Sequence, residues 1–245
     1  MNLIIDIGNT RTKAGVFDSK ELIHFEIWEK GWSISTLENI FQRFPLERSA
    51  LSTVAELAPE VVQFLRERTY FLQLSASTPL PIQNHYSTPA TLGKDRLAAV
   101  VGAYAQFPNT NCLVVDAGTC ITCDFIDLKG NYHGGSISPG IQLRLKAMHQ
   151  LTARLPLIET DPDPIVIGHS TATAMQSGAE WGAIWEVNGY RQYYMELFGQ
   201  IEVIVTGGDA NFFANHSKTK IFVVSELVLI GLNEILIFNV ENVLE

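Results

Sequence analysis

The strongest constraint on the fold is a long internal repeat. The segment IIDIGNTRTKAGVFD at residues 4–18 has the same outline as VVDAGTCITCDFID at residues 114–127. In each, an apolar run ends in an aspartate, Asp6 or Asp116, a glycine follows two positions later, and a second apolar segment begins soon after. Short apolar segments on either side of a glycine-containing turn are typical of a β-hairpin. The repeat therefore predicts two related halves, each of which opens with a strand–turn–strand unit.

The rest of the chain alternates between strand-like and helix-like segments, which predicts an α/β fold. We place the boundary between the halves after residue 110, so the predicted domains are 1–110 and 111–245. Residues 75–93 are rich in Pro, Ser and Thr and predict a long loop, and residues 227–240 predict a buried C-terminal helix. The predicted strands are 2–7, 12–18, 22–28, 49–54, 70–74, 112–116, 120–126, 132–137 and one that ends at the double glycine 207–208; the predicted helices are 35–43, 58–68, 95–106, 141–150 and 171–198.

Composition excludes several classes of protein. The 245 residues carry a net charge of -9 without a basic stripe, which argues against a general nucleic-acid binder. Asp6 interrupts the apolar N-terminus, so no signal peptide is expected, and the apolar segment 227–240 is too short to span a bilayer. Cys112, Cys120 and Cys123 predict small core thiols in a reducing compartment, because Cys-x-x-Cys positions on a strand face opposite sides. We therefore expect a cytoplasmic protein that binds no membrane.

The two hairpins have the chemistry of a phosphate site. A glycine at the turn lets a ligand approach the main chain, and successive N–H groups there can surround phosphate oxygens. A carboxylate at a strand end can hold a cation, and Mg²⁺ takes few carboxylates when phosphates and waters complete its shell. Either hairpin alone is equally well an ordinary turn with a capping aspartate. Two of them at matching places favour a nucleotide cleft between the two halves.

Three further segments complete the pattern. The TGG segment at 206–208 ends a strand where a flat ligand can lie against the backbone, and GGSISPG at 134–140 predicts a glycine-rich turn before a helix N-terminus, which favours anions. The segment LGKDR places Asp95 and Arg96 at a helix start. Asp95 alone is best interpreted as an N-cap, and the second interpretation is a general base beside an arginine that binds a carboxylate.

Taken together, DIGNTRTK (6–13), GKDR (93–96), DAGT (116–119), GGSISPG and TGG resemble the type III pantothenate kinases, in that family's order. The resemblance implies a duplicated ribonuclease-H-like fold of the actin-like ATPase superfamily, with a cleft between the domains. It implies ATP-dependent phosphorylation of pantothenate to 4'-phosphopantothenate, the first step of coenzyme A biosynthesis. It also implies a homodimer, Mg²⁺ with ATP, and a monovalent cation, K⁺ or NH₄⁺.

The resemblance also assigns residues. Asp95 would accept the proton of the pantothenate hydroxyl, Asp116 would bind the monovalent cation, and Asp6 would lie near Mg²⁺. Cys120 and Ser170 depart from the family, which more often has Ala and Asn there. The ATP site would comprise Asp6, Ile7, Gly8, Asn9, Thr10, Arg11, Thr12, Lys13 and Thr119, and the pantothenate site would comprise Tyr86, Gly93, Lys94, Asp95, Arg96 and Thr171.

Two alternatives come from other classes of protein. The segment IVIGHSTA at 165–172 resembles the strand–elbow–helix of an α/β-hydrolase, with Ser170 as nucleophile, and Asp209 and His216 follow in the matching order. The HGG segment at 133–135 resembles an oxyanion loop, although the elbow ends in Ala172 rather than glycine. A non-catalytic ATP-binding regulator is the second alternative, and the pairing of Asp95 with Arg96 argues against it.

Overall fold

The computed structural model describes residues 1–8, 11–29, 31–53 and 58–243. The chain divides into two compact units. The first unit comprises Met1–Pro108, Gly130–Tyr132 and Glu226–Glu245, and the second comprises Asn109–Lys129 and His133–Ser225. The C-terminal segment thus groups with the N-terminal half of the chain, and the domain boundary at residue 110 stays a prediction.

The first unit contains a five-stranded sheet with the order β3-β2-β1-β4-β5. Strand β2 pairs antiparallel with β1 and β3, whereas β1, β4 and β5 run parallel. The apolar run of the first strand suits a central position that is buried on both faces. The elements are β1 (Asn2–Ile7), β2 (Thr12–Asp18), β3 (Glu21–Trp28), α1 (Ile34–Arg43), β4 (Arg48–Thr53), α2 (Pro59–Arg68), β5 (Tyr70–Gln73), β6 (Gln83–Asn84), the 3₁₀ helix η1 (Pro89–Thr91), α3 (Lys94–Gln106) and α7 (Leu227–Val243).

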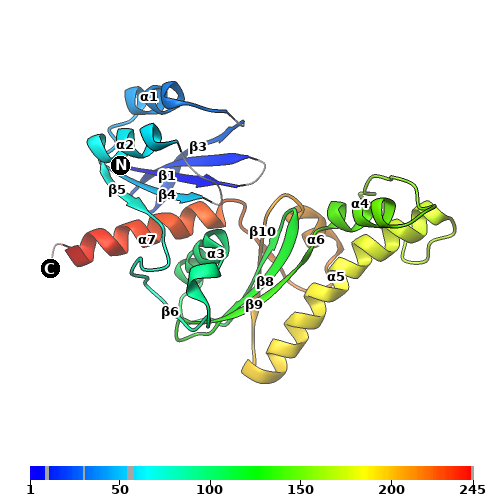
Figure 1. Ribbon diagram of the computed structural model, residues 1–245. Coiled ribbons are helices and arrows are strands. Elements are labelled where there is room, and N and C mark those ends of the chain that lie inside the picture. Colours follow the sequence, from blue (N-terminus) through cyan, green and yellow to red (C-terminus); the bar gives the residue numbers. More distant parts are fainter. Residues whose placement is uncertain (9–10, 30, 54–57, 244–245) are drawn as a thin grey trace. The chain divides into compact units, whose positions relative to one another are not determined.

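Helices cover both faces of this sheet. Figure 1 shows α1 and α2 on one side and α7 on the other. Leu3 and Ile5 of β1 pack against Leu37 of α1 and Leu65 of α2 in one buried cluster. Helix α3 packs very closely on α7, because a Cβ built on Gly231 would lie 1.8 Å from the carbonyl oxygen of Ala98. This contact fixes α3, whose first residues are part of the predicted site.

The second unit repeats the strand order of the first. The six-stranded sheet has the order β11-β10-β7-β8-β9-β6, and its strands β9-β8-β7-β10-β11 match β3-β2-β1-β4-β5. Strand β7 pairs antiparallel with β8 and parallel with β10, as β1 does with β2 and β4. This correspondence confirms the duplication predicted from the two hairpins. The elements are β7 (Cys112–Ala117), β8 (Cys120–Ile126), β9 (Asn131–Pro139), α4 (Ile141–Leu151), α5 (Thr171–Phe198), β10 (Glu202–Thr206), α6 (Ala210–His216) and β11 (Phe222–Val223).

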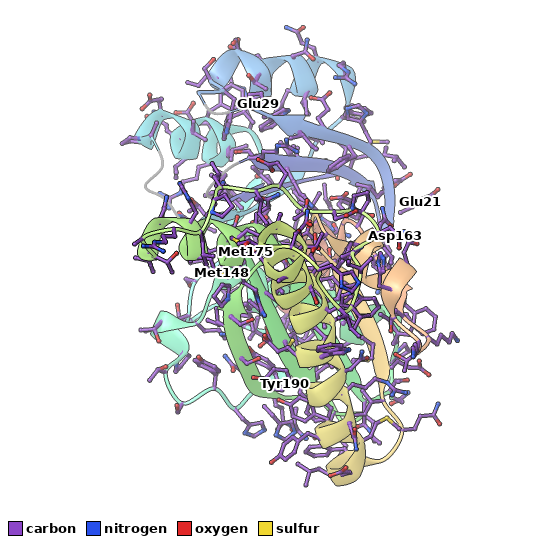
Figure 2. All side chains as sticks on the ribbon, turned by 90° about the vertical axis from the view of Figure 1, so that its right-hand side faces the viewer. Glu21, Glu29, Met148, Asp163, Met175 and Tyr190 are labelled. Atoms are coloured by element: carbon purple, nitrogen blue, oxygen red, sulfur yellow. The ribbon has the colours of Figure 1, made fainter. Side chains whose placement is uncertain are left out.

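The long helix α5 closes the core of the second unit. Met175 and Tyr190 of α5 and Met148 of α4, labelled in Figure 2, belong to the apolar cluster that covers this sheet. Phe125 of β8 is fully buried and stacks on Tyr194 of α5, with ring centroids 4.6 Å apart.

Most predicted elements are confirmed within one or two residues, and α5 has the predicted bounds 171–198. The C-terminal helix is confirmed as α7. Two details differ: the predicted loop 75–93 also contains β6 and η1, and GGSISPG is not a turn, because β9 continues to Pro139 and α4 begins at Ile141. None of the described helices is long and apolar enough to cross a membrane.

Side chains of α5 form hydrogen bonds with the segment that joins α4 to α5. Glu180 Oε1 accepts the N–H of Asp161 (2.6 Å), and Trp181 Nε1 donates to the carbonyl of Pro164 (2.8 Å). Glu180 is fully buried, and its Oε2 accepts no hydrogen bond from the residues that the structure describes. Burial raises the pKa of Glu180 from 4.5 to about 7. A buried carboxylate with one oxygen that accepts no hydrogen bond destabilises the folded state when it is ionised.

We expect the free energy of unfolding to fall as the pH rises from 4.5 to 7. In that window Glu180 is ionised in the unfolded chain but protonated in the folded one, so the unfolded state binds fewer protons. The shift corresponds to at most about 3 kcal/mol. Urea unfolding at several pH values should show a flatter profile for Glu180→Gln. The exposed Glu196→Gln on the same helix should keep the wild-type profile, and a wild-type profile for Glu180→Gln would contradict the assignment.

Candidate active site

The first predicted phosphate hairpin joins β1 to β2. Gly8 N–H donates to the carbonyl of Arg11 (3.1 Å), and Asp6 lies opposite Lys13 in the register. Asn9 and Thr10 lie outside the described residues. Thr12 is buried, and its Oγ1 accepts Trp32 Nε1–H (2.9 Å), so this hydroxyl supports the hairpin. The half-buried Ile7 precedes the turn, and Arg11 is exposed.

Asp6 has a neighbour that sequence reasoning missed. Strand β4 pairs with β1 on the side away from β2, and Ser52 lies opposite Asp6 there. Side chains of directly opposed residues share a face of the sheet. Ser52 Oγ is buried and makes no hydrogen bond with the described residues. The side chains of Asp6, Lys13 and Ser52 thus lie side by side where the strands end. The only signal for Ser52 in the sequence is a polar pair, Ser52-Thr53, at the end of an apolar strand.

The second predicted group lies at the start of α3. The N-cap of α3 is Gly93 and the helix begins at Lys94, so the interpretation of Asp95 as an N-cap is wrong. Asp95 instead lies in the first turn, where its Oδ1 accepts the N–H of Arg96 (2.8 Å). A Cβ on Gly93 would lie 2.5 Å from Asp95 Oδ1, so glycine leaves room for the carboxylate in its present position. Lys94 Nζ donates to the carbonyl of Thr53 (3.4 Å).

The structure brings Tyr86 and Arg96 together. The guanidinium carbon of Arg96 lies 5.6 Å from the centre of the Tyr86 ring, a cation–π contact. Tyr86 in turn stacks on the buried Tyr132, with an interplanar angle of 6°. Arg96 is only 5% exposed. Tyr86, Asp95 and Arg96 therefore form one cluster in the first unit.

The hairpin of the second unit is packed tightly at its turn. Gly118 N–H donates to the carbonyl of Cys120 (3.0 Å), and Gly140 N–H, at the start of α4, donates to the carbonyl of Thr119 (3.0 Å). A Cβ on Gly140 would lie 2.2 Å from Gly118 O. Gly140 is therefore required for close packing rather than for a turn. Thr119 remains exposed.

The TGG segment packs against Asp116. Gly207 has φ +93°, and a Cβ there would lie 2.5 Å from Asp116 Oδ1 and from the carbonyl oxygen of Ala117. That carbonyl also accepts the N–H of Asp209 (2.9 Å). The TGG segment and Asp116 thus lie together at the carboxyl ends of β10 and β7. Ligands of α/β proteins commonly bind at the carboxyl ends of strands.

Oxygen ligands at the two hairpins fit hard cations. Asp6 and Ser52 offer a carboxylate and a hydroxyl, and Asp116 offers a carboxylate beside main-chain carbonyls. The part of the chain that the structure describes has no cluster of three or more His, Cys, Asp or Glu side chains that could hold a metal. A protein that binds Mg²⁺ through substrate phosphates needs only one or two carboxylates. The residues therefore fit a nucleotide-bound metal rather than a metal held by protein side chains alone.

The serine-hydrolase constellation is not formed. Residues 165–170, all of them described, contain no strand, and Ser170 is the N-cap of α5, where its Oγ accepts the N–H of Thr173 (3.2 Å). His216 Nδ1 donates to the carbonyl of Phe212 (2.9 Å) rather than to Asp209. The HGG segment lies inside β9, not in a loop. The adjacent Thr171 is exposed in the first turn of α5.

The three cysteines differ in environment. Cys112 and Cys123 are fully buried, and burial raises the pKa of each thiol to about 12, which makes them unreactive. Cys120 is exposed, so the prediction of a core thiol is wrong at this position. It is the first residue of β8 and directly follows Thr119. The opposite orientation of Cys120 and Cys123 is as expected for positions three apart on a strand.

Two sheets of matching order, each with an Asp-x-Gly hairpin at a strand end, give the chain the fold of sugar kinases and actin-like ATPases. Solved structures show this likeness of fold. A Baf family protein from Campylobacter jejuni is 23% identical, with TM-score 0.63 and coverage of 98% of this chain and 99% of that chain. The inorganic polyphosphate/ATP-glucomannokinase from Arthrobacter sp. strain KM is 15% identical, with TM-score 0.50 and coverage of 98% and 100%.

Sequence comparison identifies the family. The family described as type III pantothenate kinase matches residues 2–192. A type III pantothenate kinase from Bacteroides fragilis is 42% identical to the chain over 240 residues, which cover 98% of each protein. The chain therefore belongs to the type III pantothenate kinase family. Membership in a kinase family implies ATP with a divalent metal.

Proposed function

We propose that the chain transfers the γ-phosphoryl group of ATP to the primary hydroxyl of pantothenate, giving 4'-phosphopantothenate and ADP. This is the first step of coenzyme A biosynthesis. The observation that carries the proposal is the cluster of Tyr86, Asp95 and Arg96 in a chain of this family. A carboxylate beside a buried arginine suits a substrate that bears both a hydroxyl and a carboxylate.

The acceptor site would work as follows. Asp95 receives the proton of the pantothenate hydroxyl while the new P–O bond forms and the bond to ADP breaks. Arg96 binds the substrate carboxylate with its planar fork, and Tyr86 holds the guanidinium in place. Gly93 and Lys94 line the same site, and the family resemblance also assigns Thr171 to substrate binding. Correct placement of the hydroxyl supplies much of the acceleration.

The hairpin from Asp6 to Lys13 would bind the ATP phosphates, and Thr119 would contact ATP. Lys13 adds a positive charge beside the turn, and glycine at position 8 lets phosphate approach the main chain. Asp6, with Ser52 beside it, would hold Mg²⁺ through the phosphates. When bound, the metal neutralises the charge that develops on the phosphoryl oxygens.

Asp116 would bind a monovalent cation, K⁺ or NH₄⁺. Replacing K⁺ by Na⁺ at equal ionic strength should lower kcat/KM, because the smaller ion fits a fixed set of oxygen ligands less well. Steady-state rates in chloride salts of the three cations check this prediction. Equal rates in K⁺ and Na⁺ would remove Asp116 from the cation role.

One coupled assay of ADP release tests the function itself. Pantothenate, pantetheine and simple sugars are offered in turn with MgATP, and pantothenate should give the highest kcat/KM. Turnover on a sugar alone would contradict the substrate assignment. ATP binding without turnover on any acceptor would favour the non-catalytic regulator.

We further propose that the protein is a cytoplasmic homodimer. The large apolar side chains exposed along α5 support an interface there, since Trp185 is 55% exposed and Tyr193 is 57% exposed. Sedimentation analysis of the wild type and of Trp185→Glu would test the assembly.

A further inference from the structure

Glu226 lies beside the phosphate hairpin, although no sequence motif includes it. It immediately precedes α7, and its carbonyl accepts the N–H of Ile230 (3.0 Å), so the start of the helix fixes its position. Its Oε2 lies 3.5 Å from Nζ of Lys13. Lys13 is the residue that pairs with Asp6 across the hairpin. All three residues belong to the first unit.

The contact between Glu226 and Lys13 is one of charge rather than of hydrogen bonding. The Glu226 side chain is 18% exposed, and its Oε2 is buried and accepts no hydrogen bond from the described part of the chain. A buried carboxylate in this state is costly unless a cation lies close to it. The separation of 3.5 Å exceeds the ~2.8 Å of a charge-assisted hydrogen bond. Glu226 therefore attracts the Lys13 ammonium through its charge.

We propose that Glu226 is a positioning residue for ATP binding: its charge holds the Lys13 ammonium beside Asp6, ready for the phosphates. This inference rests on the proposed phosphoryl transfer from ATP. A lysine side chain loses rotamer freedom when it binds a ligand, and a side chain that is already ordered loses less. The effect of Glu226 should therefore appear in the binding of ATP and not in the chemical step.

Kinetics of Glu226→Gln test the proposal. The KM for ATP should rise roughly twofold to fivefold, the range expected for a partly exposed ion pair, while kcat changes by less than about 1.5-fold. The matched control is Glu234→Gln, which breaks the pair between Glu234 Oε2 and Lys20 Nζ (2.9 Å). Lys20 lies between β2 and β3, so this pair also links α7 to the first sheet. It lies at the opposite end of β2 from the hairpin that joins β1 to β2. Its loss should leave the KM for ATP unchanged.

A measurement without substrates separates this proposal from the proposed function. NMR relaxation of ¹³Cε-labelled lysine, with the Lys13 signal assigned from Lys13→Arg, reports the order of this side chain in the absence of ATP. Glu226→Gln should make Lys13 more mobile and Glu234→Gln should not. An unchanged Lys13 signal, or a lower KM for ATP, would overturn the positioning role, the latter because Glu226 would then compete with phosphate. Loss of pantothenate turnover in the wild type would refute only the proposed function, since the NMR result does not depend on it.

Discussion

Replacing Asp95 with asparagine should lower kcat for pantothenate phosphorylation by roughly 10²–10⁴-fold, the usual contribution of general base catalysis. The substitution removes the proton acceptor but keeps an oxygen at Oδ1, so the hydrogen bond from Arg96 N–H and the start of α3 are preserved. The affinity for ATP should stay close to that of the wild type, because the phosphate hairpin is unchanged. Initial rates and equilibrium titration with ATP measure the two quantities separately.

The matched control for this variant is Glu60→Gln. Glu60 is the second residue of α2, as Asp95 is the second residue of α3, and it is exposed. The control removes the same favourable charge from a helix N-terminus without touching the proposed site. It should keep wild-type turnover. Near-normal turnover of Asp95→Asn would remove Asp95 from the base role.

The sequence predicted those parts of the molecule that depend on short segments. Each hairpin is specified by an apolar alternation, an aspartate and a glycine within about fifteen residues, so its strands could be located from local pattern. The duplication followed because the same pattern occurs twice. The packing of α7 against the first sheet could not be predicted this way, since it depends on contacts between distant parts of the chain.

The residues of the site also divide into those marked by a local motif and those placed by contacts between distant parts of the chain. Asp6, Asp95 and Arg96 lie in recognisable motifs, whereas Ser52 and Glu226 reach the hairpin only through strand pairing and helix packing. Around Glu226 no sequence pattern indicates a role, and around Ser52 the polar pair with Thr53 is the only such signal.

Two errors arose where local pattern has more than one solution. Glycines in GGSISPG indicate a turn, yet a strand can contain them where another backbone approaches closely, as Cys123 O does at Gly135. Asp95 follows a glycine at a helix start, and either residue could have been the N-cap. The structure has Gly93 as the N-cap, and Asp95 lies within the first turn of the helix.

Replacing Gly207 with alanine should also have a large effect, here on stability and on activation by K⁺. Gly207 has φ +93°, a conformation that alanine adopts at a cost of about 1–2 kcal/mol. Its new Cβ would also lie 2.5 Å from Asp116 Oδ1 and from the backbone oxygen of Ala117, so the end of β7 must move. We expect the free energy of unfolding to fall by about 2–4 kcal/mol. We also expect activation by K⁺ to require a higher concentration of the ion, because the carboxylate proposed to bind it is displaced.

The neighbouring glycine provides the control. A Cβ on Gly208 would meet no atom within 4 Å, and its φ lies outside the left-handed region. Gly208→Ala should therefore keep the wild-type stability and the wild-type response to K⁺. Urea unfolding and K⁺ titrations of initial rate compare the two variants. If Gly207→Ala loses stability but responds to K⁺ as the wild type does, then the contact between Gly207 and Asp116 is purely structural, and the cation must be bound by other oxygens.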